Sequence, residues 1–85
     1  MVMQVFYSDV CPDTQPFLTA LDKAGFDYEP ININETIPNL KAFLAYRDHH
    51  PAFEPIKEAN RVGVPVLIRS ENDLIFDVAE ITQEG

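Results

Sequence analysis

The sequence contains a single cysteine, Cys11, and this residue is its strongest candidate for chemistry. Cys11 follows an apolar run that ends at Tyr7, and a helical pattern begins at about Thr14. A thiol at the start of a helix faces unpaired backbone N–H groups and the positive end of the helix dipole, which stabilise a thiolate. Such positions can lower the pKa of a cysteine from about 8.5 to roughly 3.5–7.5, and the thiolate is the reactive form. The sequence therefore predicts a nucleophilic thiol at a strand-to-helix junction.

Two acidic neighbours oppose this effect on Cys11. Asp9 and Asp13 flank the thiol, and negative charges nearby disfavour a thiolate. An exposed carboxylate within ~6 Å could cancel a good part of the ~2 kcal/mol that a helix terminus contributes. Cysteine also often packs as a small, unreactive hydrophobe. The residues alone thus leave two interpretations of Cys11, a reactive thiol and a packed, unreactive one. We interpret Asp9 and Asp13 as solvated surface residues.

Composition limits the classes of partner. A lone cysteine forms no internal disulfide, so any disulfide chemistry needs an external thiol. Six Lys and Arg residues against 14 Asp and Glu give a net charge of −8. Nucleic acids and anionic membranes are bound mainly through basic residues, so we expect neither as a partner. The sequence has no secretory signal pattern and no run near the ~20 apolar residues of a membrane span, which predicts a cytoplasmic protein.

The 85 residues are enough for one modest core, so we expect a single domain over residues 1–85. Hydrophobic periodicity and Gly and Pro signals predict the order β-α-β-α(α)-β-β. The first two strands should be parallel and the last two antiparallel, giving a four-stranded mixed sheet with packed helices, an α/β fold. The expected strands are 1–7, 28–33, 62–68 and 74–76, the helices are 14–24, 40–47 and 52–60, and the loops are 34–39 and 70–73, with one helical turn in 77–85.

Two other groups of residues have types that could bind a ligand. His49 and His50 are adjacent in an expected loop, far in sequence from Cys11, and make a poor ligand set, so no metal site is predicted. Lys41 and Arg47 on the second helix could hold a ligand carboxylate. The preferred interpretation is that they are solvated residues beside the apolar stripe of that helix.

Three sequence segments together resemble a known superfamily. They are residues 5–8 (Val-Phe-Tyr-Ser) before 11–14 (Cys-Pro-Asp-Thr), residues 63–68 (Gly-Val-Pro-Val-Leu-Ile), and residues 39–48 in the second helical region. Over roughly residues 2–77 the chain resembles the thioredoxin superfamily, and within it the small glutaredoxin-related proteins. The resemblance implies a thioredoxin-like fold whose C-terminal helix is short or missing.

The resemblance also implies a set of site residues. Cys11 matches the family's nucleophile, and Pro12 would keep the helix start rigid. Thr14 stands where dithiol members have a second cysteine, and its hydroxyl could donate to the Cys11 sulfur; an ordinary role in the first helical turn is the equal alternative. Pro65 matches the family's cis-proline, and the main chain of Val64 would pair with a substrate backbone. The alternative for Pro65 is that it only shapes a strand.

The function implied is a monothiol glutaredoxin-like thiol–disulfide oxidoreductase. Cys11 would form a mixed disulfide with a protein or small-molecule substrate, and an external thiol would resolve it. The resemblance implies glutathione or another low-molecular-weight thiol as co-substrate, with no bound cofactor and no metal.

Departures from the family pattern define the alternative function. Ser8 stands where a basic residue is usual, Gly63 replaces a threonine, and 75–76 (Ile-Phe) replace a Gly-Gly pair. These differences favour a thioredoxin-fold binding or adaptor domain whose chemistry has lapsed. A third possibility, an iron–sulfur cluster with glutathione as co-ligand, belongs to relatives with Cys-Gly-Phe-Ser, which differs from the Cys-Pro-Asp-Thr found here.

Overall fold

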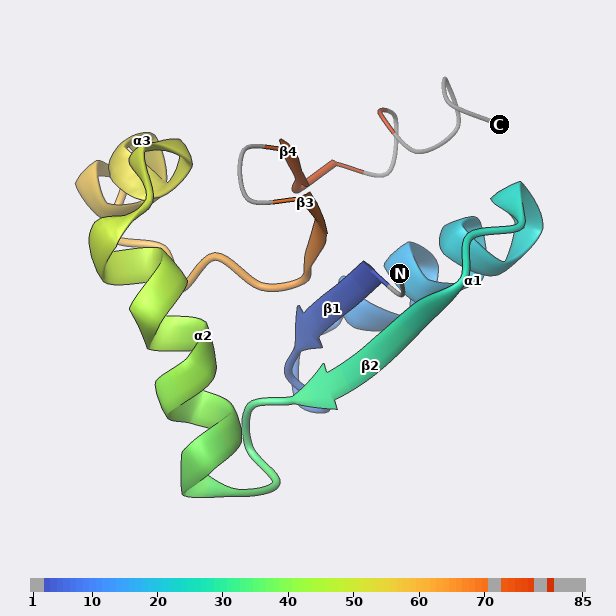
Figure 1. The fold of residues 1–85 in the computed structure, drawn as a ribbon, viewed down its shortest axis with the longest axis horizontal. Coiled ribbons are helices and arrows are strands. Elements are labelled where there is room, and N and C mark those ends of the chain that lie inside the picture. The colour runs from blue at the N-terminus through green and yellow to red at the C-terminus, as the bar shows by residue number, and fades with distance from the viewer. Residues whose placement is uncertain (1–2, 71–72, 78–79, 81–85) are drawn as a thin grey trace.

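The computed structural model describes residues 3–70, 73–77 and 80, and within them the chain folds as a sheet with helices packed on it (Figure 1). The order of strands in the sheet is β2-β1-β3-β4; β1 pairs with β2 in parallel, and the other two pairs are antiparallel. The predicted α/β class is confirmed, and the mixed four-stranded sheet has a thioredoxin-like arrangement. The strands are β1 (Met3–Tyr7), β2 (Tyr28–Asn32), β3 (Val66–Ser70) and β4 (Asp73–Ile75).

Local sequence signals explain where the helices begin and end. The first helix ends at Gly25, which adopts the left-handed conformation (φ 80°) that suits glycine. The second begins at Ile37, earlier than the predicted residue 40, because the Thr36 side chain accepts a hydrogen bond from the N–H of Asn39 and caps it. The described helices are α1 (Thr14–Ala24), α2 (Ile37–His49), the short 3-10 helix η1 (Pro51–Phe53) and α3 (Glu54–Glu58).

Two predicted boundaries near the C-terminus are wrong. The strand expected over 62–68 begins only at Val66, because residues 62–65 follow an irregular path in which Gly63 has a φ of 103°. The single helix expected over 52–60 is divided into η1 and α3. The predicted turn at 70–73 and the predicted helical turn in 77–85 lie largely outside the described residues.

The core has two layers, one on each face of the sheet. Successive strand residues point to opposite faces, so Val5 packs with α1 while Phe6 packs with α2 and η1. Both side chains are almost fully buried, as predicted for a central strand. The buried residues on the α1 face are Val5, Phe17, Leu21, Leu67 and Ile75, and those on the other face are Phe6, Ile33, Phe43, Phe53, Val66 and Ile68.

Phe53 joins several elements of the second layer. Its ring is fully buried and lies 5.8 Å from the ring of Phe43 and 5.1 Å from that of Phe76, in edge-to-face geometry in both cases. Phe43 in turn contacts Phe6 of β1, with ring centroids 5.7 Å apart. These contacts tie η1 to α2, to the central strand and to the segment that follows β4.

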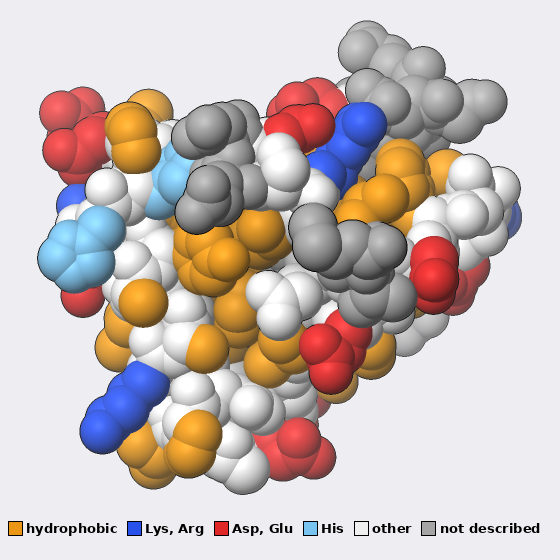
Figure 2. Space-filling model, viewed as in Figure 1, with side chains coloured by type: hydrophobic (Ala, Val, Ile, Leu, Met, Phe, Trp, Pro, Cys, Tyr) orange, Lys and Arg blue, Asp and Glu red, His pale blue; other side chains and the backbone are white. Residues whose placement is uncertain are grey.

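Acidic side chains are scattered over the surface and do not form a single patch on the face shown in Figure 2. Hydrophobic side chains are visible between them, toward the middle of this face. None of the helices in the described part of the chain has the length and apolar character needed to cross a membrane.

Tyr28 gives this fold a pH-dependent contact between β2 and α1. Its hydroxyl donates a hydrogen bond of 2.9 Å to a carboxylate oxygen of Asp22. Burial, together with Asp22, raises the pKa of Tyr28 to about 12, because both favour the neutral phenol. The folded state therefore holds this proton more tightly than the unfolded chain does.

We expect the stabilisation from Tyr28 to be complete below about pH 10 and to disappear as the pH rises toward 12, because the unfolded chain loses the proton first. The variant Tyr28→Phe lacks this proton. The free energy of unfolding of wild type minus that of Tyr28→Phe, measured by urea denaturation, should decrease between pH 9 and pH 12. A difference that stays constant with pH would contradict this account.

Candidate functional site

Cys11 lies in the tight loop that connects β1 to α1. Its N–H donates to the carbonyl of Ser8 (3.1 Å), and its own carbonyl accepts from the N–H of Thr14 (3.2 Å), so two successive turns lead into the helix. The helix itself begins at Thr14, and Asp13 precedes it without capping it through its side chain. Cys11 is half-buried and its thiol is free.

The sulfur of Cys11 faces the Val-Pro segment that precedes β3. Its Sγ lies 3.9 Å from the carbonyl oxygen of Val64, a contact between residues 53 positions apart. The peptide bond between Val64 and Pro65 is cis, and Pro65 is buried. The sheet explains the contact, because Phe6 near the end of β1 pairs with Val66 at the start of β3. The structure thus brings together Cys11, Val64 and Pro65, which the sequence analysis singled out from separate segments.

Thr14 differs from its expected role as a hydrogen-bond donor to the sulfur. Its buried hydroxyl donates to the carbonyl of Ser8 at 2.7 Å. A hydroxyl has one proton, so in this arrangement it cannot also donate to Cys11. Thr14 fastens the helix start to the end of β1, which is the structural alternative considered for it. Pro12 is exposed within the same turn.

Ser8 is the centre of a polar network. It is buried, and its Oγ accepts from the side-chain amide of Asn34 (2.6 Å) and from the N–H of Val10 (3.3 Å). The same amide donates to the carboxylate of Asp9 (2.9 Å), and this bond holds the pKa of Asp9 below its ordinary value. These hydrogen bonds therefore attach the loop that carries Cys11 to the loop between β2 and α2.

Sequence reasoning did not identify Asn34. One signal was present, because Asn34 closely follows β2 and the carboxyl ends of parallel strands meet at one edge of a sheet. A polar residue there lies near whatever follows β1, which in this chain is the cysteine loop.

Arg47 is the second residue whose role the sequence did not indicate. The preferred prediction was a solvated side chain and the alternative a carboxylate ligand, but the guanidinium binds backbone instead. Its Nε donates to the carbonyl of Val62 and its Nη2 to the carbonyl of Arg61, both at 2.8 Å. Arg47 thus connects α2 to the segment that leads into Val64. Lys41, its predicted counterpart, is exposed.

The two histidines do not share a ligand site. Nδ1 of His50 accepts from the N–H of Ala52 at 3.0 Å and caps η1, and His49 is exposed. Across the residues that the structure describes, no group of three or more His, Cys, Asp and Glu side chains could hold a metal ion.

The backbone conformation and the packing at position 63 both require glycine. Its φ of 103° is strained for any residue with a side chain. A Cβ atom here would also lie 2.8 Å from Cε1 of Phe53 and 3.3 Å from Cγ2 of Ile56. A threonine at this position would not fit this packing.

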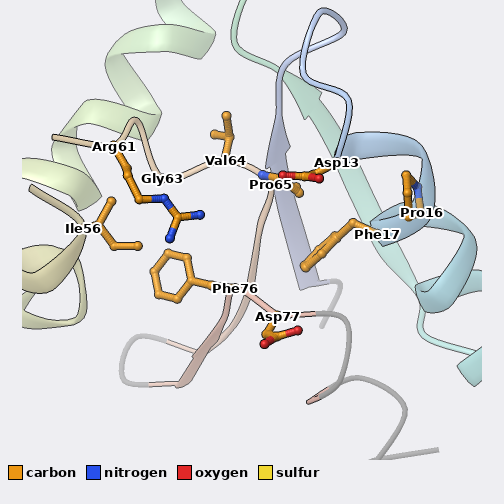
Figure 3. A pocket seen from close by; sticks show the side chains of 10 residues that line it. All are labelled: Asp13, Pro16, Phe17, Ile56, Arg61, Gly63, Val64, Pro65, Phe76 and Asp77. Atoms are coloured by element: carbon orange, nitrogen blue, oxygen red, sulfur yellow. The ribbon is translucent and has the colours of Figure 1, made fainter. Parts of the chain in front are cut away.

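A cleft of about 430 Å³ lies beside the Val-Pro segment (Figure 3). Asp13, just before α1, and Phe17 of α1 line one side, and Phe76 and Asp77 line another. Among the described residues that line it, Arg61 is the only basic one, and Figure 3 shows its side chain extending into the cleft toward the ring of Phe76. A cation, an aromatic ring and two carboxylates therefore surround a space next to Val64.

The two glycines with positive φ provide a matched test of the close approach to Phe53. We expect Gly63→Ala to lower the free energy of unfolding by about 2–6 kcal/mol, since backbone strain and overpacking each cost roughly 1–3 kcal/mol. Gly25→Ala suffers only the backbone strain, roughly 1–3 kcal/mol, because nothing lies within 4 Å of its added Cβ. Equal losses for the two variants in urea denaturation would show that the Phe53 contact contributes nothing.

Comparison with known proteins gives a family but no activity. No protein-family model matches the chain, and no solved structure matches it significantly. An uncharacterized protein of Haemophilus influenzae is 36% identical to it over 77 residues, which cover 91% of this chain and 90% of the relative. The chain therefore belongs to the same family as this uncharacterized Haemophilus influenzae protein.

Proposed function

We propose that this protein is a glutaredoxin-like monothiol thiol–disulfide oxidoreductase with Cys11 as its nucleophile. The observation that carries the proposal is the position of the Cys11 sulfur, 3.9 Å from the carbonyl oxygen of Val64. This contact places a free, half-buried thiol next to a main-chain segment that belongs to no strand, where a substrate backbone can be bound. The resemblance of residues 5–14 and 63–68 to glutaredoxin-related proteins adds support.

The reaction consists of two exchange steps at sulfur. The Cys11 thiolate attacks one sulfur of a substrate disulfide R–S–S–R′, forming Cys11–S–S–R and releasing R′–S⁻, which takes up a proton. An external thiolate then attacks the R sulfur, forms a new disulfide with R and restores the Cys11 thiolate. The external thiol is required because the chain has no second cysteine and Thr14 cannot replace one.

The main chain around Val64 is suited to orient the substrate. Residues 62–65 belong to no strand, so an extended ligand can pair with the main chain of Val64 as an added strand would. The cleft continues from this point between α1 and Phe76, which gives the remainder of the substrate a place to bind.

Glutathione, or another thiol carrying a carboxylate, fits this cleft as the low-molecular-weight co-substrate. Its carboxylate would bind the guanidinium of Arg61, the only basic group among the described lining residues. Glutathione keeps thiols reduced in the cytoplasm. We therefore propose a cytoplasmic location for the protein.

The first test is glutathione uptake by Cys11. Reduced wild-type protein mixed with glutathione disulfide should gain one glutathione by intact mass, faster than the same protein unfolded in urea at the same pH. Cys11→Ser should gain none and lose all turnover of a glutathione mixed disulfide, with an unchanged circular dichroism spectrum. Uptake no faster than in urea would favour the adaptor function, and turnover by Cys11→Ser would eliminate the mechanism.

The second test concerns Arg61. Arg61→Gln should slow the reaction of Cys11 with glutathione disulfide by roughly 2–5-fold, the effect of losing about 0.4–1 kcal/mol of exposed ion pairing. Its reaction with the uncharged bis(2-hydroxyethyl) disulfide should change much less. Lys23→Gln, which removes a positive charge at the far end of α1, is the control for net charge. Equal slowing with both disulfides would exclude carboxylate binding by Arg61.

A further inference from the structure

We infer that Arg47 is a positioning residue, which holds the main chain of Val64 in place against the Cys11 sulfur. The inference rests on the proposed function for its kinetic consequence but not for its structural one. The Arg47 guanidinium donates two hydrogen bonds, and both go to backbone carbonyls of one short segment.

The segment from Arg61 to Pro65 has little regular structure to hold it. The N–H of Arg61 donates to the carbonyl of Ile56 (3.0 Å), and this is the last backbone hydrogen bond from α3. Strand pairing begins again only at Val66, opposite Phe6. Between these two points, the described hydrogen bonds to the segment's carbonyls come from side chains, namely from Arg47 to residues 61 and 62 and from the Cys11 thiol to Val64.

Arg47 is chemically suited to this task. A guanidinium presents its N–H groups in a rigid planar fork, so Nε and Nη2 can bind two neighbouring acceptors at once. Both distances are 2.8 Å, within the short range typical of charge-assisted hydrogen bonds. A lysine, with one flexible point charge, cannot reproduce this bidentate geometry.

Gly63 makes the position of Val64 depend on this anchor. It lies directly between the carbonyls that Arg47 holds and Val64, and glycine allows wide rotation of the backbone. Phe53 and Ile56 close one side of Gly63 by contact, but they form no hydrogen bond with it. With residues 61 and 62 held by Arg47 and Val66 held by its pairing with Phe6, both ends of the segment are fixed, and the Val64 carbonyl stays near the sulfur.

The expected kinetic effect follows from the geometry of thiol exchange. A misplacement of about 1 Å in a positioning element can cost on the order of 100-fold in rate. Arg47→Met keeps most of the side chain's apolar stem but removes both hydrogen bonds. We expect it to slow the reaction of Cys11 with glutathione disulfide by roughly 10–100-fold, with Arg47→Lys falling between Met and wild type. Alkylation of Cys11 by iodoacetamide, which needs no main-chain partner, should change less than about twofold.

Lys41→Met is the matched control, because it removes an exposed positive charge from the same helix. It should leave the rate with glutathione disulfide within about twofold of wild type. Circular dichroism and thermal unfolding of each variant identify any loss of fold. If Arg47→Met is unfolded, the rate of Arg47→Lys with glutathione disulfide decides, and it should be lower than that of wild type. Equal rates for Arg47→Met and Lys41→Met, or equal slowing of disulfide exchange and alkylation in Arg47→Met, would overturn the inference.

A spectroscopic measurement separates this inference from the proposed function. In ¹H–¹⁵N spectra, Arg47→Met should shift or broaden the amide signals of Val62, Gly63 and Val64 while leaving those of Leu21 and Ala24 in α1 unchanged. If wild type shows no exchange activity but these signals move, the proposed function fails and the positioning role stands. If the signals of residues 62–64 do not move, the positioning role fails whatever the activity.

Discussion

The antiparallel pairing of β1 with β3 is the constraint on which the site depends. Phe6 pairs with Val66, so the end of the first strand lies beside the start of the third. The chain turns toward α1 just after β1 and enters β3 at Val66. The loop that carries Cys11 and the segment that carries Val64 therefore lie at the same end of these two paired strands. Burial of Val5, Phe6, Val66 and Leu67 fixes the register, because a slip of one residue would exchange the two core faces.

The helices on the second face do more than cover the sheet. The segment before β3 has no strand partner, and its position comes from Arg47 of α2 and from Phe53 of η1, which touches the backbone at Gly63. Phe53 is itself packed between Phe43 and Phe76. Hydrophobic packing at Gly63 and hydrogen bonds at residues 61 and 62 therefore hold neighbouring residues of the same segment.

The sequence predicted the order of elements, the mixed sheet and the central strand because each depends on local periodicity and on Gly and Pro signals. The segment around Val64 appeared as strand from residue 62, because its apolar pattern does not reveal the positive φ of Gly63. The hydrogen bonds of Thr14 and Arg47 could not be predicted, since each joins a side chain to a backbone carbonyl that only the fold brings near. The place of Asn34 after β2 indicated a position near the cysteine loop, but not its bond to the Ser8 hydroxyl. Hydrogen bonds of side chains leave no periodic pattern in a sequence.

The negative and positive side chains around the site lie at different places relative to the thiol, and this arrangement affects how a charged substrate would bind. Two carboxylates flank the thiol in the sequence: Asp9, which accepts from the Asn34 amide, and Asp13, which also lines the cleft. The positive group, Arg61, lies in the cleft beyond Val64. Attraction for an anionic substrate therefore acts away from the sulfur. In the proposed reaction, the substrate's carboxylate binds near Arg61 while its disulfide reaches Cys11 along the main chain of Val64. Charge then selects the substrate, and the backbone orients it.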